Sequence, residues 1–132
     1  MKTNQFTEGL VTFNDGILHI VYHEGVILDE HVFMKQIECR KRITGDQSFF
    51  MILDMSQASD ISESGLAFAA ENPHPGNVRA IAVITRKGQD YIRAKLYSVF
   101  DQPNIPTKAF LSEEDALHWF GSFESEKSKK AA

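Results

Sequence analysis

The chain has 132 residues, of which 42% are hydrophobic and 24% are charged, and its formal net charge at pH 7 is −4. These values are typical of one soluble globular domain that is long enough to bury a core. No basic cluster stands out inside the predicted domain, which argues against a protein that binds nucleic acid.

Two short strands open the predicted fold, at residues 10–13 and 17–23. Apolar and polar residues alternate in the second of them, as they do in a half-buried strand. Asn14, Asp15 and Gly16 lie between the two segments and favour a tight turn, because Asn and Gly adopt positive φ at little cost. We therefore predict an antiparallel hairpin.

A first helix is predicted after Asp29, which is a suitable N-cap. At helical spacing its buried stripe comprises Val32, Phe33, Ile37, Cys39 and Ile43. Gly45 and Asp46 end the helix. Residues 49–53 follow and are all apolar, which predicts a strand that is covered on both faces.

The second half of the chain alternates helices and strands. Ser62 is expected to cap a second helix, which residues 72–76 end because they contain two prolines and a glycine. A strand over Val78–Ile84 precedes a third helix, and residues 102–106 close that helix. A last strand at 107–111 leads to a fourth helix, whose first turn is acidic.

This order of elements predicts the fold class. We expect an α/β fold with a mixed, mainly parallel sheet of about five strands and four helices. The domain is expected to span residues 1–121. Residues 122–132 are polar and rich in lysine, and we expect them to form a disordered tail.

Nothing in the sequence indicates a catalytic residue, a metal site or a cofactor. His19 and His23 would lie roughly 13 Å apart on one strand, too far to hold one ion. The sole cysteine, Cys39, excludes an internal disulfide and is best explained as a small buried side chain in a cytoplasmic protein. The glycine motifs of nucleotide-binding loops and of the nucleophile elbow are missing. We therefore expect a protein that is not an enzyme.

Polar residues gather between the third predicted strand and the second predicted helix. They are Asp54, Ser56, Ser59, Asp60, Ser62, Glu63, Ser64 and Gly65. Ligands and partners often meet an α/β sheet where strands end and helices begin, because helix N–H groups point outward there. Ser62 and Asp60 would also be needed simply to cap the helix. The sequence leaves both interpretations open.

At this loop the chain resembles a STAS domain, the fold of bacterial anti-sigma-factor antagonists. The motif of that family reads roughly Leu-Asp-Leu-Ser, then three or four residues, then Asp-Ser-Ser-Gly-Leu. The matching segments here are Leu53-Asp54-Met55-Ser56 and Ser62-Glu63-Ser64-Gly65-Leu66, with five residues between them. The element order over residues 9–121 also matches, and residues 106–120 are similar to the last strand and helix of the divergent SpoIIAA-like group.

The resemblance implies a cytoplasmic regulator that binds a protein partner, such as a regulatory kinase or a sigma-factor regulator, through this loop and its helix. In the antagonists, a partner kinase phosphorylates the serine two residues before the motif glycine. That position is Glu63 here, and Ser62 replaces the preceding aspartate. The switch is therefore locked by a permanent charge, moved to Ser62 or Ser64, or absent. A homodimer is a further partner that the sequence leaves open.

A second functional hypothesis follows from the same resemblance. The chain would then bind a small apolar or amphipathic ligand, such as a lipid, between the sheet and the third helix. Tyr91, Lys95 and Tyr97 are the expected pocket residues. We expect no membrane span, because no apolar run approaches the roughly 18 residues that one requires. The first residues of the chain also lack the apolar core of a signal peptide.

Overall fold

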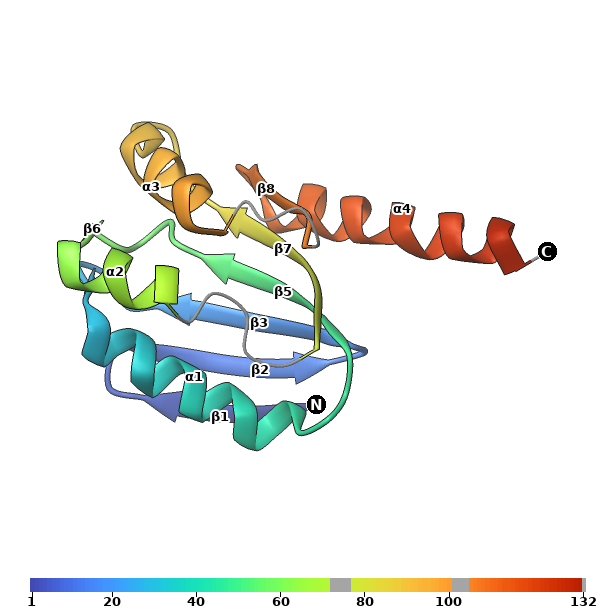
Figure 1. The fold of residues 1–132 in the computed structure, drawn as a ribbon, viewed down its shortest axis with the longest axis horizontal. Coiled ribbons are helices and arrows are strands. Elements are labelled where there is room, and N and C mark those ends of the chain that lie inside the picture. The colour runs from blue at the N-terminus through green and yellow to red at the C-terminus, as the bar shows by residue number, and fades with distance from the viewer. Residues whose placement is uncertain (72–76, 101–104, 132) are drawn as a thin grey trace.

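The computed structural model describes residues 1–71, 77–100 and 105–131. The helices in these ranges are α1 (Glu30–Thr44), α2 (Glu63–Glu71), α3 (Asp90–Phe100) and α4 (Glu113–Ala131). The main sheet contains β1 (Lys2–Phe6), β2 (Gly9–Asn14), β3 (Ile17–Tyr22), β5 (Phe49–Asp54), β7 (Val78–Ile84) and β8 (Thr107–Phe110). A separate pair is formed by β4 (Ile27–Leu28) and β6 (Asp60–Ile61). The α/β class and the four helices were both predicted correctly (Figure 1).

The main sheet has the strand order β1-β2-β3-β5-β7-β8 across the described residues. The first three strands are antiparallel, and β3, β5, β7 and β8 are parallel. Asp15 and Gly16 form the predicted turn between β2 and β3, with φ angles of 52° and 76°. The sequence predicted about five strands because it missed β1, whose residues are mostly polar. This strand lies at the edge of the sheet, where one row of backbone groups can face water.

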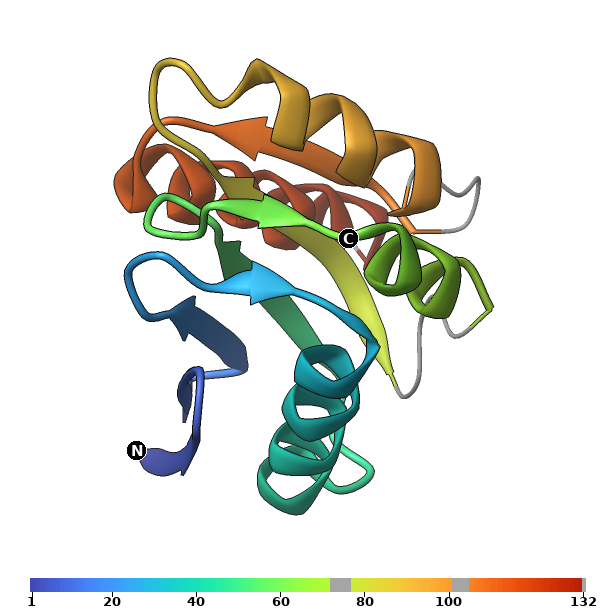
Figure 2. The same ribbon diagram turned by 90° about the vertical axis from the view of Figure 1, so that its left-hand side faces the viewer.

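The helices cover the two faces of the sheet unequally. Each connection from β3 to β5, β7 and β8 moves along the sheet in the same direction, so α1, α2 and α3 lie on one face. The last helix, α4, packs on the other face against β5, β7 and β8 (Figures 1 and 2). The order of the parallel strands never reverses. The sheet in the described residues therefore has no switch point of the kind at which doubly wound sheets form a ligand crevice.

The strand β5 is buried on both faces, as its sequence predicted. Residues 49–53 are all buried, and β5 lies between β3 and β7. Met51 and Leu53 belong to the core beneath α1, α2 and α3, whereas Phe50 and Ile52 belong to the smaller core beneath α4. The continuous apolar run thus supplies side chains to two cores at once.

The predicted stripe of α1 is largely confirmed. Four of its five residues are buried, and Ile37 is only partly buried. Gln36 and Arg40 are buried on the same side of the helix, which the sequence did not predict. In the middle of α1 the buried side chain is therefore Gln36, one position before the Ile37 that the apolar residues indicated.

Three predictions concern the ends of helices. The helix α4 continues to Ala131, past residue 121, where we predicted that the domain ends. The predicted end of α2 at residues 72–76 lies outside the described residues, as do residues 102–104 of the predicted end of α3 at 102–106. None of the helices in the described ranges is long and apolar enough to cross a membrane.

Candidate functional site

The predicted site residues lie together between the end of β5 and the first turn of α2. Asp54 is the last residue of β5, and its Oδ1 accepts hydrogen bonds from the backbone N of Ser56 at 2.9 Å and from Ser56 Oγ at 2.6 Å. These bonds close a local turn of the type that aspartate favours. The chain then crosses to β6 and enters α2 at Glu63.

Ser62 caps α2, as predicted. Its Oγ accepts a hydrogen bond from the backbone N of Gly65 at 3.1 Å, which satisfies one of the free N–H groups at the start of the helix. The backbone N of Ser62 donates to the carbonyl oxygen of Leu28 at 3.0 Å. Ser64 Oγ lies 3.1 Å from Ser62 Oγ. Glu63 and Ser64 are both exposed, so the first turn of α2 presents a carboxylate and a hydroxyl to solvent.

Gly65 allows α2 to approach the chain before α1 closely. A Cβ atom at this position would overlap the carbonyl oxygen of Leu28 and would lie 3.1 Å from its carbonyl carbon. It would also lie 3.2 Å from the Cα of Asp29. These obstacles are backbone atoms and cannot move aside as a side chain can. The glycine of the sequence motif thus has a packing role in this fold.

The pair of strands β4 and β6 ties the site loop to the segment that precedes α1. Ile27 pairs with Asp60 and Leu28 pairs with Ile61, in parallel. Two more backbone bonds extend this contact, from Ser59 N to the oxygen of Val26 at 2.8 Å and from Gly25 N to the oxygen of Gln57 at 2.9 Å. Segments more than thirty positions apart in the sequence therefore form one surface with the start of α2.

Residues in and just before α3 hold the loop from a third side. Gln89 is only 1% exposed, and its Nε2 donates to the carbonyl oxygens of Met55 at 3.0 Å and Ala58 at 3.1 Å. The hydroxyl of Tyr91 donates to the carbonyl oxygen of Ser59 at 2.8 Å. Sequence analysis missed Gln89, because a single glutamine before a helix looks like an ordinary polar turn residue. Its buried amide satisfies carbonyl groups that have no strand partner.

Lys95 of α3 forms an ion pair with the site loop. Its Nζ lies 2.7 Å from Asp60 Oδ1 and donates to the carbonyl oxygen of Ile61 at 3.2 Å. The hydrogen bond from Lys95, together with one from the backbone N of Ile61, lowers the pKa of Asp60 below its ordinary value. The carboxylate form is therefore the one that holds β6 to α3.

Replacing Lys95 with methionine is expected to raise the pKa of Asp60 toward the ordinary aspartate value of about 3.9. A carboxyl group with a lowered pKa stabilises the folded chain above the ordinary pKa, and this contribution is lost as the pH falls through the lowered value. Wild type should thus exceed Lys95→Met in stability at neutral pH, and the difference should shrink below about pH 4. Carboxyl-detected NMR titration measures the pKa, and Lys41→Met on α1 serves as the control. An unchanged Asp60 titration in Lys95→Met would contradict the ion pair.

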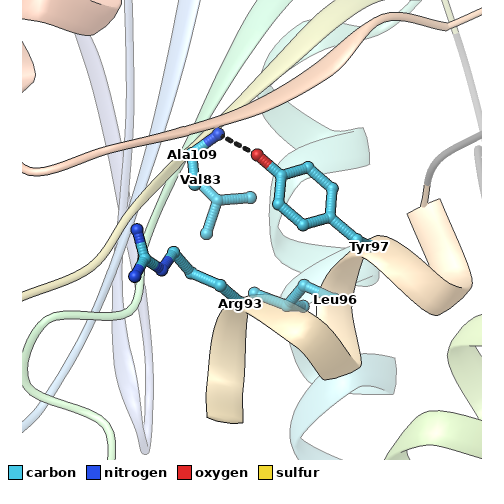
Figure 3. Close-up of a pocket in the computed structure, with 5 residues that line it drawn as sticks. All are labelled: Val83, Arg93, Leu96, Tyr97 and Ala109. Atoms are coloured by element: carbon cyan, nitrogen blue, oxygen red, sulfur yellow. Dashed lines mark hydrogen bonds between the residues drawn. The ribbon is translucent and has the colours of Figure 1, made fainter. Parts of the chain in front are cut away.

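Tyr97 lies apart from the other two residues of the predicted ligand pocket. It lines a small cavity under α3 with Val83, Arg93, Leu96 and Ala109, and its hydroxyl accepts a hydrogen bond from Ala109 N at 2.6 Å (Figure 3). The cavity does not admit a water molecule. Tyr91 and Lys95 instead contact the site loop. Residues two positions apart on a helix point in different directions, so Lys95 and Tyr97 face different neighbours.

The histidines do not form a metal centre with other side chains in the described ranges. Within residues 1–71, 77–100 and 105–131, no group of three or more His, Cys, Asp or Glu side chains could hold a metal ion. His19 Nδ1 lies 3.6 Å from Glu113 Oε1.

Comparison with known proteins places the chain in a family. A family model described as a domain of unknown function (DUF7793) matches residues 11–124. The chain belongs to the DUF7793 family. The match runs from β2 into α4, so it includes the site loop and the α3 residues that hold it. No curated protein and no solved structure matches the chain.

Proposed function

We propose that this chain is a non-enzymatic, cytoplasmic regulatory domain that binds a protein partner through residues 54–66 and the first turn of α2. The observation that carries the proposal is the way α3 holds this loop. Gln89, Tyr91 and Lys95 bond to six of the seven residues from Met55 to Ile61. A surface that is already ordered loses little conformational entropy on binding, which favours recognition.

The chemistry of the exposed surface suits a protein partner. Glu63 and Ser64 offer polar groups at the start of α2. Ile27 is 55% exposed and pairs with Asp60, and Tyr91 is 46% exposed beside Ser59. An aliphatic and a tyrosine side chain next to a charged group resemble the mixture found at protein–protein interfaces.

The STAS resemblance supports the same location and suggests the class of partner. The motif Ser-Gly-Leu falls at the first turn of α2, and Glu63 stands where an antagonist carries its phosphorylated serine. We propose a kinase-like or sigma-factor-regulating partner that recognises this fixed negative charge. Glutamate bears one charge, whereas phosphoserine bears about −1.5 to −2, so the imitation of a phosphate is partial.

The ligand-binding alternative receives less support from the geometry. Pockets that bury small molecules usually measure about 300–1,000 Å³. The cavity under α3 has no room even for a water molecule. A lipid-like ligand at this place would require α3 to move away from β7 and β8.

Replacing Glu63 with serine is expected to weaken partner binding about tenfold or more, which corresponds to about 1.4 kcal/mol. The charge lies at the positive end of the α2 dipole, where a partner would sense it. The melting temperature should barely change, because Glu63 is exposed. Titration calorimetry against the protein that co-purifies with the tagged chain from its source organism measures the affinity.

Glu114→Ser is the matched control for this experiment. Glu114 is also exposed in the first turn of a helix, but α4 lies on the opposite face of the sheet. It should leave the affinity unchanged. If wild type and Glu63→Ser bind the partner with equal affinity, the loop is not the interface. That result would favour the ligand-binding hypothesis.

A further inference from the structure

The two edges of the main sheet differ in how their backbone groups are used. The strand β8 forms one edge, and β1 forms the other. At the β8 edge, the hydroxyl of Tyr97 accepts a hydrogen bond from the backbone N of Ala109 at 2.6 Å. A side chain of α3 therefore already occupies this edge, and β8 has only four residues. These two features make β8 a poor template for another strand.

The edge formed by β1 is open. In the described part of the chain, β1 pairs with β2 alone. Phe6 and Gly9 flank the two-residue turn of this hairpin, and such a closing pair is hydrogen-bonded. Alternation along the strand then turns the backbone groups of Gln5 and Thr3 away from β2. Consistent with this, Gln5 N donates to the side chain of its own neighbour, Asn4 Oδ1, at 3.0 Å. This bond is exposed, so a second strand can replace it.

The side of α1 that lies next to this edge carries two opposite charges. Glu38 and Arg42 are exposed, one helical turn apart, and they line a small pocket beside Asn4, Gln5 and Phe6 of β1. Among the described residues, neither Glu38 nor Arg42 forms an ion pair. A carboxylate and a guanidinium are therefore both available to a partner that approaches β1.

We propose that the chain forms a two-fold symmetric dimer in which β1 pairs antiparallel with β1 of a second copy. In the register that overlaps all five residues of both strands, Thr3 pairs with Gln5 of the second copy and exchanges hydrogen bonds with it. The two-fold axis then passes between Asn4 and its own copy, which form a pair without hydrogen bonds. The two main sheets become one continuous sheet.

The same symmetry places the two α1 helices side by side and antiparallel. In each copy α1 lies above β1 and β2 (Figure 1). Because neighbouring strands are about 4.8 Å apart, the two helices stand roughly 10 Å apart, the spacing at which helices pack. Asn4 lies beside the turn from Glu38 to Arg42, so Glu38 of each helix meets Arg42 of the other. This contact goes beyond the proposed function and does not use residues 54–66, because β2 and β3 separate β1 from β5.

Disulfide cross-linking tests the register of the paired strands. In Asn4→Cys the two new thiols face each other across the axis, with Cα atoms about 4.5 Å apart, so mild oxidation should give a covalent dimer. Lys2→Cys is the matched control on the same strand and face, because its two copies lie roughly 13 Å apart, too far for a disulfide. Cys39 stays in both variants, since it is only 4% exposed. Absence of cross-linking in Asn4→Cys, or equal cross-linking of the two variants, would overturn the proposal.

Charge reversal tests the contact between the helices. Glu38→Arg and Arg42→Glu each place like charges across the axis, so each should raise the dimer Kd about fivefold or more. The double variant Glu38→Arg/Arg42→Glu exchanges the two charges and should restore the Kd of wild type. Sedimentation equilibrium of the full chain measures the Kd. Lys41→Glu is the control, because Lys41 is exposed on the same helix but does not line the pocket beside β1.

The two single variants also separate a direct contact from the effect of net charge. The chain carries a formal charge of −4, so Glu38→Arg brings the net charge closer to zero and Arg42→Glu moves it further away. General repulsion between acidic chains would therefore strengthen one dimer and weaken the other. Opposite effects of the two variants, or a wild-type chain that stays monomeric at every concentration, would overturn the proposal.

Discussion

Replacing Ile52 with alanine is expected to lower the free energy of unfolding by about 2–5 kcal/mol. Ile52 is fully buried in the middle of β5, beside His19 of β3 and Ala82 of β7. It belongs to the core beneath α4, which also contains Phe120. Ala82 is too short to fill the space that the lost atoms leave, so a cavity should remain and add to the lost hydrophobic burial.

Urea denaturation measures this effect, and Ile27→Ala is the matched control. The same atoms are removed from a side chain that is 55% exposed, so the expected loss of stability is about 0.5 kcal/mol or less. A loss below about half a kcal/mol for Ile52→Ala would contradict the central position of β5.

The elements that could be predicted from the sequence have strong local signals. Residues 49–53 are apolar without interruption, which only a strand with two covered faces explains well. The turn at Asp15 and Gly16 requires two positive φ angles, and these residue types tolerate them. The capping role of Ser62 follows from its hydroxyl and its place before an apolar periodicity.

The elements that were missed depend on partners far away in the sequence. The strands β4 and β6 have two residues each and exist only because Ile27 and Asp60 are brought side by side by the packing of α1 and α2. The edge strand β1 is mostly polar and forms because β2 offers it a free row of backbone groups. No local sequence pattern predicts such strands.

Buried polar side chains explain the error in the α1 stripe. Gln36 Nε2 donates to the hydroxyl of Tyr22 at 3.1 Å, and Arg40 donates to the sulfur of Met51 at 3.0 Å. Burial lowers the pKa of Arg40 to about 10, so the guanidinium remains charged at neutral pH. A rule that assigns charged residues to solvent cannot predict such a side chain, because its burial depends on a core that folds around it.

The sequence indicated which residues form the candidate site, but it did not indicate the side chains that hold them in place. The polar run after β5 and the glycine motif are local features. Gln89 and Lys95, which hold that run, are about thirty residues further along the chain, and neither residue type signals a structural role by itself. Tyr97 was grouped with Tyr91 and Lys95 by its position in sequence, and the helical period of α3 separates them.

Replacing Gly65 with alanine is expected to destabilise the fold by about 1–3 kcal/mol, the range seen when extra atoms are forced into a packed site. The sign of this change in stability distinguishes Gly65 from an ordinary glycine within a helix. Glycine to alanine inside a helix normally stabilises by about 0.5–1 kcal/mol, because alanine has less freedom to lose. At Gly65 the new Cβ would overlap the carbonyl oxygen of Leu28, so either α2 or the β4–β6 pair must move.

Gly121→Ala is the matched control for this reversal of sign. Gly121 lies in α4, and a Cβ atom there would meet nothing within 4 Å beyond its chain neighbours and the backbone of its own helix. It should therefore show the ordinary stabilisation, measured in the same urea titrations. Hydrogen exchange adds a local readout, because the N–H of Ser62 donates to Leu28 and should lose protection in Gly65→Ala. If Gly65→Ala were as stable as wild type and kept that protection, the close approach of α2 to Leu28 would be wrong. The ordered surface around Glu63, on which the proposed interface depends, would lose its physical basis with it.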